Sequence, residues 1–187
     1  MNLIVNDGLK EVNVSVKKVR EPIRYIRNSP ARWKKFKEIS ELIGVESKCS
    51  LSLDVPTRWN STYIMLKTAC FFEKSFDKFE ETESSLRADL GDDIPDFLDW
   101  QSIKDMVGIL KVFYEITVKI FDSNYVIENS LFSEIFDLKS IINDWQSSSK
   151  LFFYNMGFNM KQKFDKYWGD PHKMNSLIII ATILDIS

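Results

Sequence analysis

The sequence predicts a mainly α-helical protein with one or two short β-strands near residues 50–60. Apolar residues recur at intervals of three and four along six long segments, which is the spacing of one helix face. An alternation of apolar and polar residues, typical of a half-buried strand, occurs at 51–55. With 44% hydrophobic residues in 187, the chain is also long and apolar enough to bury a globular core.

The first predicted helix runs from about Asn6 to Asn28 and has a basic solvent-facing side. Its apolar stripe consists of Leu9, Val12, Val16, Val19, Ile23 and Ile26. Pro22 conflicts with an unbroken helix, because proline removes one backbone hydrogen bond and clashes with the preceding turn at a cost of about 3 kcal/mol. We therefore expect a kink or a break at Pro22.

The second predicted helix begins at Pro30, with Ser29 as its N-cap, and ends at Gly44. Its first turns carry a basic cluster interleaved with two aromatic residues, and its members are Arg32, Lys34, Lys35 and Lys37. The aromatic residues, Trp33 and Phe36, have the spacing of core positions, so we expect them to pack inside the protein. The lysines Lys34, Lys35 and Lys37 are candidates for contacts with a phosphate backbone.

Basic residues are concentrated in the first part of the chain. Residues 1–48 contain eleven Lys and Arg against six Asp and Glu, a balance of +5, whereas the remainder has a balance of −7. Such a division can mark a segment that faces nucleic acid, and a solvated helix face is the alternative explanation.

The segment from Leu51 to Thr62 is the most informative stretch of the sequence. Pro56 ends the predicted strand, because proline has no N–H group for a sheet and keeps the preceding residue extended. Arg58 and Trp59 follow the bend, and this pairing of a cation with a flat aromatic surface suits phosphate and an unstacked base. The alternative is that Trp59 is a core anchor and that Arg58 caps a helix or pairs with a carboxylate.

The rest of the sequence predicts four further helices, from about Ser61 to Glu83, from Asp96 to Asp122, from Ile127 to Trp145 and from Phe152 to Trp168. Between them, Glu80–Asp96 is acidic and indicates a flexible surface connector; its carboxylates lack the ligand order of a calcium loop. The apolar run at 177–184 is helical or extended by pattern. An end in such a run suggests truncation.

Few residues suggest chemistry. Cys49 and Cys70 indicate neither a disulfide framework nor a zinc site, and Cys70 is expected as a small core residue rather than a nucleophile. His172 is expected on a surface loop. We find no glycine-rich phosphate loop, signal peptide or membrane-spanning run, and expect no cofactor, no metal, no membrane contact and an intracellular setting.

Five blocks of the sequence carry a family resemblance. They lie at residues 2–9, at 29–32 with 35–38, at 54–63, at 164–168 and at 180–185. In this order they resemble successive blocks of the hAT superfamily transposases, of the plant Ricesleeper and Activator type. The most diagnostic block is Thr-Arg-Trp-Asn-Ser-Thr at 57–62.

The resemblance implies a remnant of an RNase H-like core together with most of a helical insertion. Residues 1–62 would supply basic helices and a strand of the core remnant, and residues 63–187 the helical region associated with it. It also implies that the catalytic carboxylates, the BED zinc finger and the dimerisation region of the family lie outside this chain, and that Asp54 does not belong to the catalytic triad. Because two-metal catalysis needs its carboxylates together, we expect no DNA cleavage.

The resulting functional expectation is a truncated, catalytically inactive, transposase-derived protein of the nucleus that retains DNA binding of low specificity. The expected DNA contacts are Arg58, Trp59, Lys34, Lys35 and Lys37, and the resemblance implies that Trp59 stacks on an extruded base. One alternative is a protein–protein interaction module that pairs with full-length hAT transposase homologues. The other is a gene fragment without a function.

Overall fold

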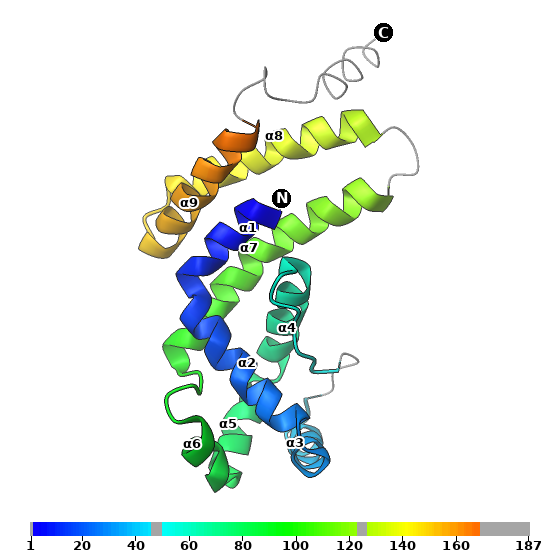
Figure 1. Cartoon of the computed structure of the whole chain (residues 1–187), viewed down its shortest axis with the longest axis vertical. Coiled ribbons are helices and arrows are strands. Elements are labelled where there is room, and N and C mark those ends of the chain that lie inside the picture. The colour runs from blue at the N-terminus through cyan, green and yellow to red at the C-terminus, as the bar shows by residue number, and fades with distance from the viewer. Residues whose placement is uncertain (1, 46–49, 123–126, 169–187) are drawn as a thin grey trace. The chain divides into compact units, whose positions relative to one another are not determined.

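Helices form the regular secondary structure of residues 2–45, 50–122 and 127–168, which are the residues that the computed structural model describes (Figure 1). The predicted mainly helical fold is confirmed. Cys49, His172 and the apolar run at 177–184 lie outside the described residues. Among the described helices, none is long and apolar enough to cross a membrane. The elements are α1 (Asn2–Leu9), the 3-10 helix η1 (Lys10–Val12), α2 (Asn13–Arg27), α3 (Pro30–Leu42), α4 (Trp59–Phe71), α5 (Glu73–Thr82), α6 (Ser84–Leu90), α7 (Phe97–Asp122), α8 (Ile127–Gln146) and α9 (Leu151–Trp168).

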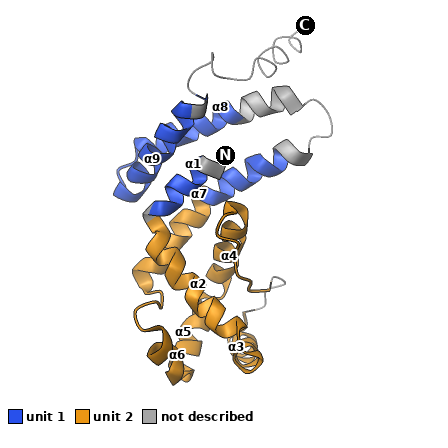
Figure 2. Ribbon diagram, in the orientation of Figure 1, with its two compact units in different colours: residues 1–11, 110–187 blue, residues 12–109 orange. Residues whose placement is uncertain are grey.

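The chain divides into two compact units, and the division falls inside α7 (Figure 2). Unit 1 comprises residues 1–11 and 110–187, and unit 2 comprises residues 12–109. The boundary expected after residue 62 does not coincide with this division, since residues on both sides of it lie in unit 2. Hydrogen bonds that Arg20 and Thr62 donate to Asp54 illustrate why these residues belong together.

The core of unit 2 is built around Phe36 of α3. Its ring centroid lies 5.8 Å from that of Phe72, 5.1 Å from that of Phe76 and 5.7 Å from that of Phe79. Aromatic rings at such separations bury large apolar areas and favour tilted or edge-on arrangements, as seen here. The prediction that Phe36 packs inside the protein is confirmed.

In unit 1, α9 packs against α8 and α1. The ring of Phe113 lies 6.2 Å from the ring of Trp145, and Met156, Met160 and Phe164 of α9 are buried. Lys163 of α9 forms an ion pair with Asp7 of α1 at 3.2 Å. The apolar spacing that predicted these helices therefore also identified the faces that pack.

The expectation of a kink or break at Pro22 is wrong in one respect, because α2 is helical through Pro22. The helical pattern is interrupted instead at η1, before α2. Pro22 is buried beside Val19, Ile23 and Ile26. Burial of this apolar stripe offsets the hydrogen bond that the proline cannot make.

Two further predicted boundaries also need correction. The helix expected over 61–83 is divided into α4 and α5 at Phe72, which lets both Phe72 and Phe76 reach Phe36. The acidic connector expected at 80–96 contains α6, because Leu86 is buried in the core and ties this stretch to it. Tertiary contacts, which the spacing of residues along the chain does not show, decide both differences.

The strand expected near residues 50–60 is not formed in the described residues. Residues 50–55 are without regular structure, and the alternation does not separate a buried face from an exposed one: Leu51 is buried, whereas Leu53 and Val55 are partly exposed. A strand needs a partner for its backbone groups, and here side chains supply the bonds instead. Val55, for example, bonds to the hydroxyl of Ser61.

Candidate nucleic-acid interface

A buried ion pair holds the segment before α4 against α2. Arg20 donates two hydrogen bonds of 2.8 Å to the two carboxylate oxygens of Asp54, and Thr62 of α4 donates a third of 2.7 Å. The side chain of Asp54 is 0% exposed and that of Arg20 is 16% exposed. Burial by itself would raise the pKa of the Asp54 carboxyl, but the bonds from Arg20 and Thr62 outweigh it and hold the pKa below its ordinary value.

Ser61 fixes the turn that leads into α4. Its hydroxyl accepts a hydrogen bond from the N–H of Val55 at 2.8 Å and lies 2.9 Å from the carbonyl oxygen of Arg58. The N–H of Arg58 donates to the carbonyl oxygen of Val55 at 2.8 Å, which closes the turn over Pro56. The position of Arg58 therefore follows from local bonds rather than from a β-sheet.

The two residues of the Arg-Trp pair have different environments. Trp59 begins α4 and is only 5% exposed, so the core-anchor alternative describes its position. Arg58 is exposed, and within the described residues it forms no ion pair. The stacking role of Trp59 stays a prediction, and it would require the indole to leave this position.

The three candidate lysines of α3 also differ. The side chain of Lys34 is 80% exposed and lies 3.8 Å from Glu38 across one helical turn, a weak surface pair. Lys37 is exposed, and its ammonium lies 5.4 Å from the centre of the Trp33 ring. Lys35 instead donates to the carbonyl oxygen of Thr82 and pairs with Glu83 at 3.0 Å, so it joins α3 to the end of α5.

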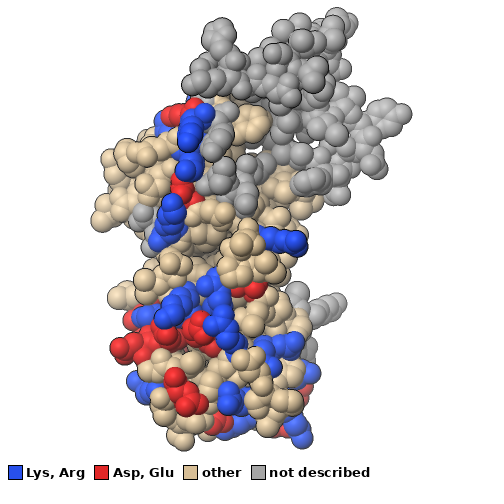
Figure 3. Space-filling view, in the orientation of Figure 1, with Lys and Arg blue, Asp and Glu red and all other residues tan. Residues whose placement is uncertain are grey.

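Acidic residues from later in the chain neutralise much of the positive charge of residues 1–48. Lys17 pairs with Asp93 and Lys18 with Asp99, each at 2.8 Å. Arg20 pairs with Asp54. Figure 3 accordingly shows blue and red side chains next to one another on the visible face of unit 2. The +5 balance of residues 1–48 therefore does not give α2 a positively charged surface, because three of its cations are paired with carboxylates.

Four cations remain where α2 ends and α3 begins, and we call them the basic corner: Arg27, Arg32, Lys34 and Lys37. The guanidinium of Arg27 lies 4.6 Å from the centre of the Trp33 ring, which Lys37 also approaches. Arg32 donates to the carbonyl oxygen of Tyr25 at 2.9 Å and lies over the ring of that residue. Cation–π contacts hold Arg27, Arg32 and Lys37 in place without cancelling their charge, and Lys34 has only its weak surface pair with Glu38.

The sequence already placed Arg32 in the basic cluster of the second helix, but it was not among the expected DNA contacts, and Arg27 was missed as a member of the group. Both flank the Ser29-Pro30 helix break, and Ser29 is the N-cap of α3, accepting a hydrogen bond from the N–H of Arg32. The break was visible in the sequence, and a tight turn between two basic helix ends brings their charges together. Asking which cations flank the break would have found them.

Other chemistry is not supported at this site. In the part of the chain that the structure describes, no three His, Cys, Asp or Glu side chains are grouped to hold a metal ion. Burial, together with the nearby charge of Glu73, raises the pKa of the Cys70 thiol to about 11. Cys70 is half-buried and its thiol is protonated at neutral pH, so it suits a packing role better than a nucleophilic one.

Comparison with known proteins finds two family models. Residues 1–109 match the ZBED1 RNase-like helical domain, and residues 129–185 match the hAT-like transposase, RNase-H fold. The first match ends at the residue that ends unit 2. No solved structure matches the chain.

The similar curated proteins come from plants. The zinc finger BED domain-containing proteins RICESLEEPER 2 and RICESLEEPER 1 of Oryza sativa subsp. japonica are 28% and 27% identical to this chain over 185 residues, which is 99% of the chain and 24% of each relative. DAYSLEEPER of Arabidopsis thaliana is 24% identical over 81% of the chain and 20% of its own length. The chain thus spans about a quarter of the length of the curated relatives that it matches.

Proposed function

Because this chain belongs to the hAT-type transposase-derived proteins, with a ZBED1 RNase-like helical domain in residues 1–109, we propose that it binds DNA with low sequence specificity through the basic corner and Arg58. The observation that carries the proposal is the selective neutralisation of charge in unit 2. Lys17, Lys18 and Arg20 of α2 are paired with carboxylates at 2.8 Å, whereas the only ion pair of the basic corner among the described residues is the weak surface pair of Lys34 with Glu38 at 3.8 Å.

The chemistry of the basic corner suits the DNA backbone rather than the base edges. Lys34 and Lys37 are exposed ammonium groups, which bind phosphates as point charges. Arg27 and Arg32 are held against Trp33 and Tyr25 by their rings, so their guanidinium groups are available at little further entropic cost. Such contacts give affinity that does not depend on base sequence and that falls steeply with salt.

The salt dependence of DNA binding tests this proposal. Fluorescence anisotropy with labelled duplex and hairpin DNA is measured between about 50 mM and about 200 mM salt. Removing two phosphate contacts with Lys34→Ala/Lys37→Ala should weaken binding to both DNAs and lower the slope of log K against log salt by about two. Lys74→Ala, an exposed lysine of α5 outside the corner, is the matched control and should leave both quantities unchanged. Absence of binding at low salt, or equal behaviour of the two variants, contradicts the proposal.

The segment before α4 needs its own variants. Arg58→Ala should lower the affinity for DNA without changing the folded core, because its side chain is exposed. Trp59→Ala would empty a core position at a cost of about 3–5 kcal/mol, so Trp59→Phe is the useful variant. If Trp59 stacks on an extruded base, Trp59→Phe weakens hairpin binding more than duplex binding at unchanged melting temperature; if it is a core anchor, it lowers the melting temperature and leaves the hairpin preference unchanged.

We further propose that these 187 residues bind DNA without cutting it. The family resemblance puts the catalytic carboxylates outside the blocks found here. Asp54 is the acidic residue inside the most diagnostic block, and both of its oxygens are already engaged by Arg20 and Thr62 in a buried setting. A plasmid-nicking assay with Mg²⁺ or Mn²⁺ tests this. Nicking that Asp54→Asn abolishes would refute it.

A second candidate function is pairing with full-length hAT transposase homologues. It is favoured by apolar side chains that α4 and the preceding segment leave exposed: Leu53, Val55, Ile64 and Phe71, of which Phe71 is 60% exposed. Ile64 and Phe71 are seven residues apart and share one face of α4. Capture of a full-length homologue should be lost in Phe71→Ser and retained in Leu42→Ser, an even more exposed apolar position on α3.

DNA binding implies a nuclear location, which we propose for this chain. The support is the family membership and the basic corner, whose charge suits contact with nucleic acid. A fluorescent fusion expressed in plant cells should accumulate in the nucleus. An even distribution between nucleus and cytosol, at a size that excludes passive diffusion, contradicts this placement.

A further inference from the structure

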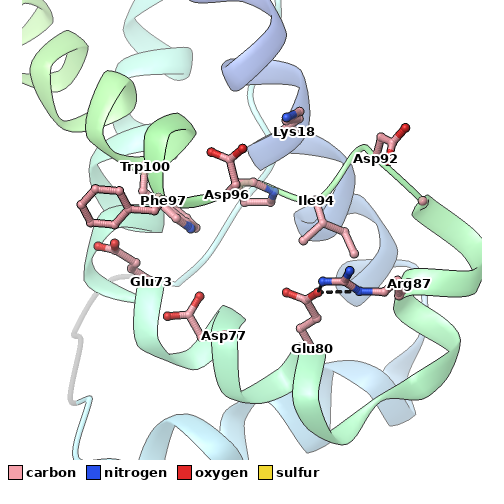
Figure 4. Close-up of a pocket in the computed structure, with 12 residues that line it drawn as sticks. Lys18, Glu73, Asp77, Glu80, Arg87, Asp92, Ile94, Asp96, Phe97 and Trp100 are labelled. Atoms are coloured by element: carbon pink, nitrogen blue, oxygen red, sulfur yellow. Dashed lines mark hydrogen bonds and ion pairs between the residues drawn. The ribbon is translucent and has the colours of Figure 1, made fainter.

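An open cavity of about 510 Å³ lies in unit 2 between α5, the start of α7 and the loop that joins α6 to α7 (Figure 4). Its lining mixes acidic and apolar residues, and it also contains two basic residues, Lys18 and Arg87. The acidic side chains are Glu73, Asp77, Glu80, Asp92 and Asp96, and the apolar ones are Ile94, Pro95, Phe97 and Trp100. A smaller recess adjoins it and shares Asp77, Glu80, Ile94, Pro95 and Trp100.

The carboxylates of the cavity are only partly neutralised. Glu73 pairs with Lys104 at 2.7 Å, and Glu80 pairs with Arg87. The carboxylate of Asp77 forms no hydrogen bond or ion pair with any residue that the structure describes, although it lies between Glu73 and Glu80 on the same face of α5 (Figure 4). The cavity therefore has excess negative charge, concentrated around Asp77.

The pKa of the Asp77 carboxyl also reflects this excess of negative charge. Partial burial is the largest cause that raises the pKa of its carboxyl, and the negative charges of Glu73, Glu80 and Glu81 add to it, outweighing Lys104. A cation beside Asp77 would relieve this repulsion. The fold thus keeps a carboxylate in a position that a positively charged group would stabilise.

A second observation, independent of the carboxylates, is the indole N–H of Trp100, which lacks a hydrogen-bond acceptor among the described residues. Trp100 lines the cavity and is 3% exposed. Figure 4 shows this indole on the side of Asp77 and Glu73, facing the cavity. A buried N–H without an acceptor costs about 1–3 kcal/mol, and a carbonyl oxygen that reaches it, once the side chains at the cavity wall move aside, would remove that cost. Phe97 adds an exposed aromatic ring at the rim.

We propose that this cavity binds an arginine side chain presented by a basic peptide segment of a protein partner. Asp77 and the neighbouring carboxylates accept hydrogen bonds from the guanidinium, whose planar fork matches a carboxylate. The rings of Phe97 and Trp100 pack on the guanidinium plane and the aliphatic stem. The indole N–H donates to a carbonyl oxygen of the peptide backbone. A ligand that supplies both a guanidinium for Asp77 and a carbonyl oxygen for the indole N–H is a peptide rather than a bare ion.

Two other occupants fit less well. DNA is excluded from this cavity by charge, so the proposal is independent of the DNA-binding surface at the basic corner. No group of three His, Cys, Asp or Glu side chains that could hold a metal ion is found among the described residues. The aromatic wall and the unpaired indole N–H have no use for a metal ion but suit an organic cation.

Fluorescence anisotropy with a labelled Gly-Ser-Arg-Gly-Ser peptide tests the inference on the full chain. The matched probe replaces arginine with citrulline, which has the same shape and no charge. The arginine peptide should bind and the citrulline peptide should bind at least about tenfold more weakly, because a charge-assisted hydrogen bond is replaced by a neutral one. Equal binding of the two peptides overturns the proposal.

Variants of the chain locate the binding. Asp77→Asn keeps the shape of the side chain, has no partner to break, and should weaken arginine binding about tenfold. Asp89→Asn, an exposed acidic position on α6 outside the cavity, should have no effect. A melting curve confirms that both variants fold. Binding that is unchanged in Asp77→Asn, or that falls equally in both variants, shows a diffuse charge attraction and overturns the proposal.

Discussion

The guanidinium of Arg20 donates two hydrogen bonds of 2.8 Å to the carboxylate of Asp54, which lies 34 residues later in the sequence. The pair links α2 to the segment that precedes α4, and Thr62 adds a bond from α4 itself. Because the side chain of Asp54 is fully buried, its charge depends on these partners for stability. This contact gives the segment at 54–62 its position without a β-sheet.

Removing the cation of this pair should destabilise the protein strongly. Arg20→Ala leaves Asp54 as a buried charge without its main partner, and we expect the free energy of unfolding to fall by about 3 kcal/mol. Urea denaturation measures it. Arg24→Ala removes an exposed arginine one turn later, whose pair with Glu21 is worth little, and should change stability by less than about 1 kcal/mol. Equal effects of the two variants would show that burial does not distinguish the pairs.

The stability of unit 2 should decrease in acid because of Asp54. Arg20 and Thr62 lower the pKa of Asp54 in the folded protein below its ordinary value of 3.8, despite the opposing effect of burial. A lowered pKa in the folded state means that the contribution is complete above the unfolded value and is lost as the pH falls through the folded value. The stability difference between wild type and Asp54→Asn should therefore be largest near neutral pH and shrink below about pH 4. A difference that is constant down to pH 2 contradicts the assigned cause.

The α8–α9 contact predicts opposite effects at two helical glycines. A Cβ on Gly157 of α9 would lie 2.8 Å from the backbone nitrogen of Gln146 and 3.0 Å from Cβ of Trp145, so Gly157→Ala should destabilise by about 1–3 kcal/mol. Gly108 of α7 has open space around that position, and Gly108→Ala should stabilise by about 0.5–1 kcal/mol through helix propensity. Thermal melting compares them, and the same sign for both would refute the close approach at Gly157.

Cys70 should react slowly with alkylating reagents in the folded protein. Burial, with the charge of Glu73, raises the pKa of its thiol to about 11, and the thiolate is the reactive species. In a Cys49→Ser background, the rate of iodoacetamide labelling at pH 8 should be about two orders of magnitude below that of a free cysteine. Unfolding in urea should restore the ordinary rate. Fast labelling of the folded chain would show that Cys70 is not held in an apolar setting.

The helices could be predicted from the sequence because their cause is local. Residues three and four apart share one face of a helix. The spacing of the apolar residues in α7 and α9 therefore predicts their buried positions, such as Ile103, Met106, Met160 and Phe164. The helix start at Pro30 followed in the same way from Ser29. The division at Phe72 could not be predicted, because it depends on Phe36, which lies 36 residues earlier.

The candidate site was predictable in part. Exposure of Arg58, Lys34 and Lys37 agrees with a surface role, and the resemblance pointed to the segment at 57–62. Partners of the remaining charges lie far along the chain: Lys17 meets Asp93, Lys18 meets Asp99, and Lys35 meets Glu83. Counting charges by sequence segment therefore overestimated the free positive charge of residues 1–48. It also missed Arg27 as part of the basic corner.

By itself the sequence determined the helical class, the packing faces and the family, because each of these depends on the order and spacing of neighbouring residues. Tertiary structure alone decided which charges remain free, that Trp59 is buried while Arg58 beside it is exposed, and that Asp77 faces a cavity without a partner. The physical reason is that ion pairing and burial are set by residues that meet only after the chain has folded.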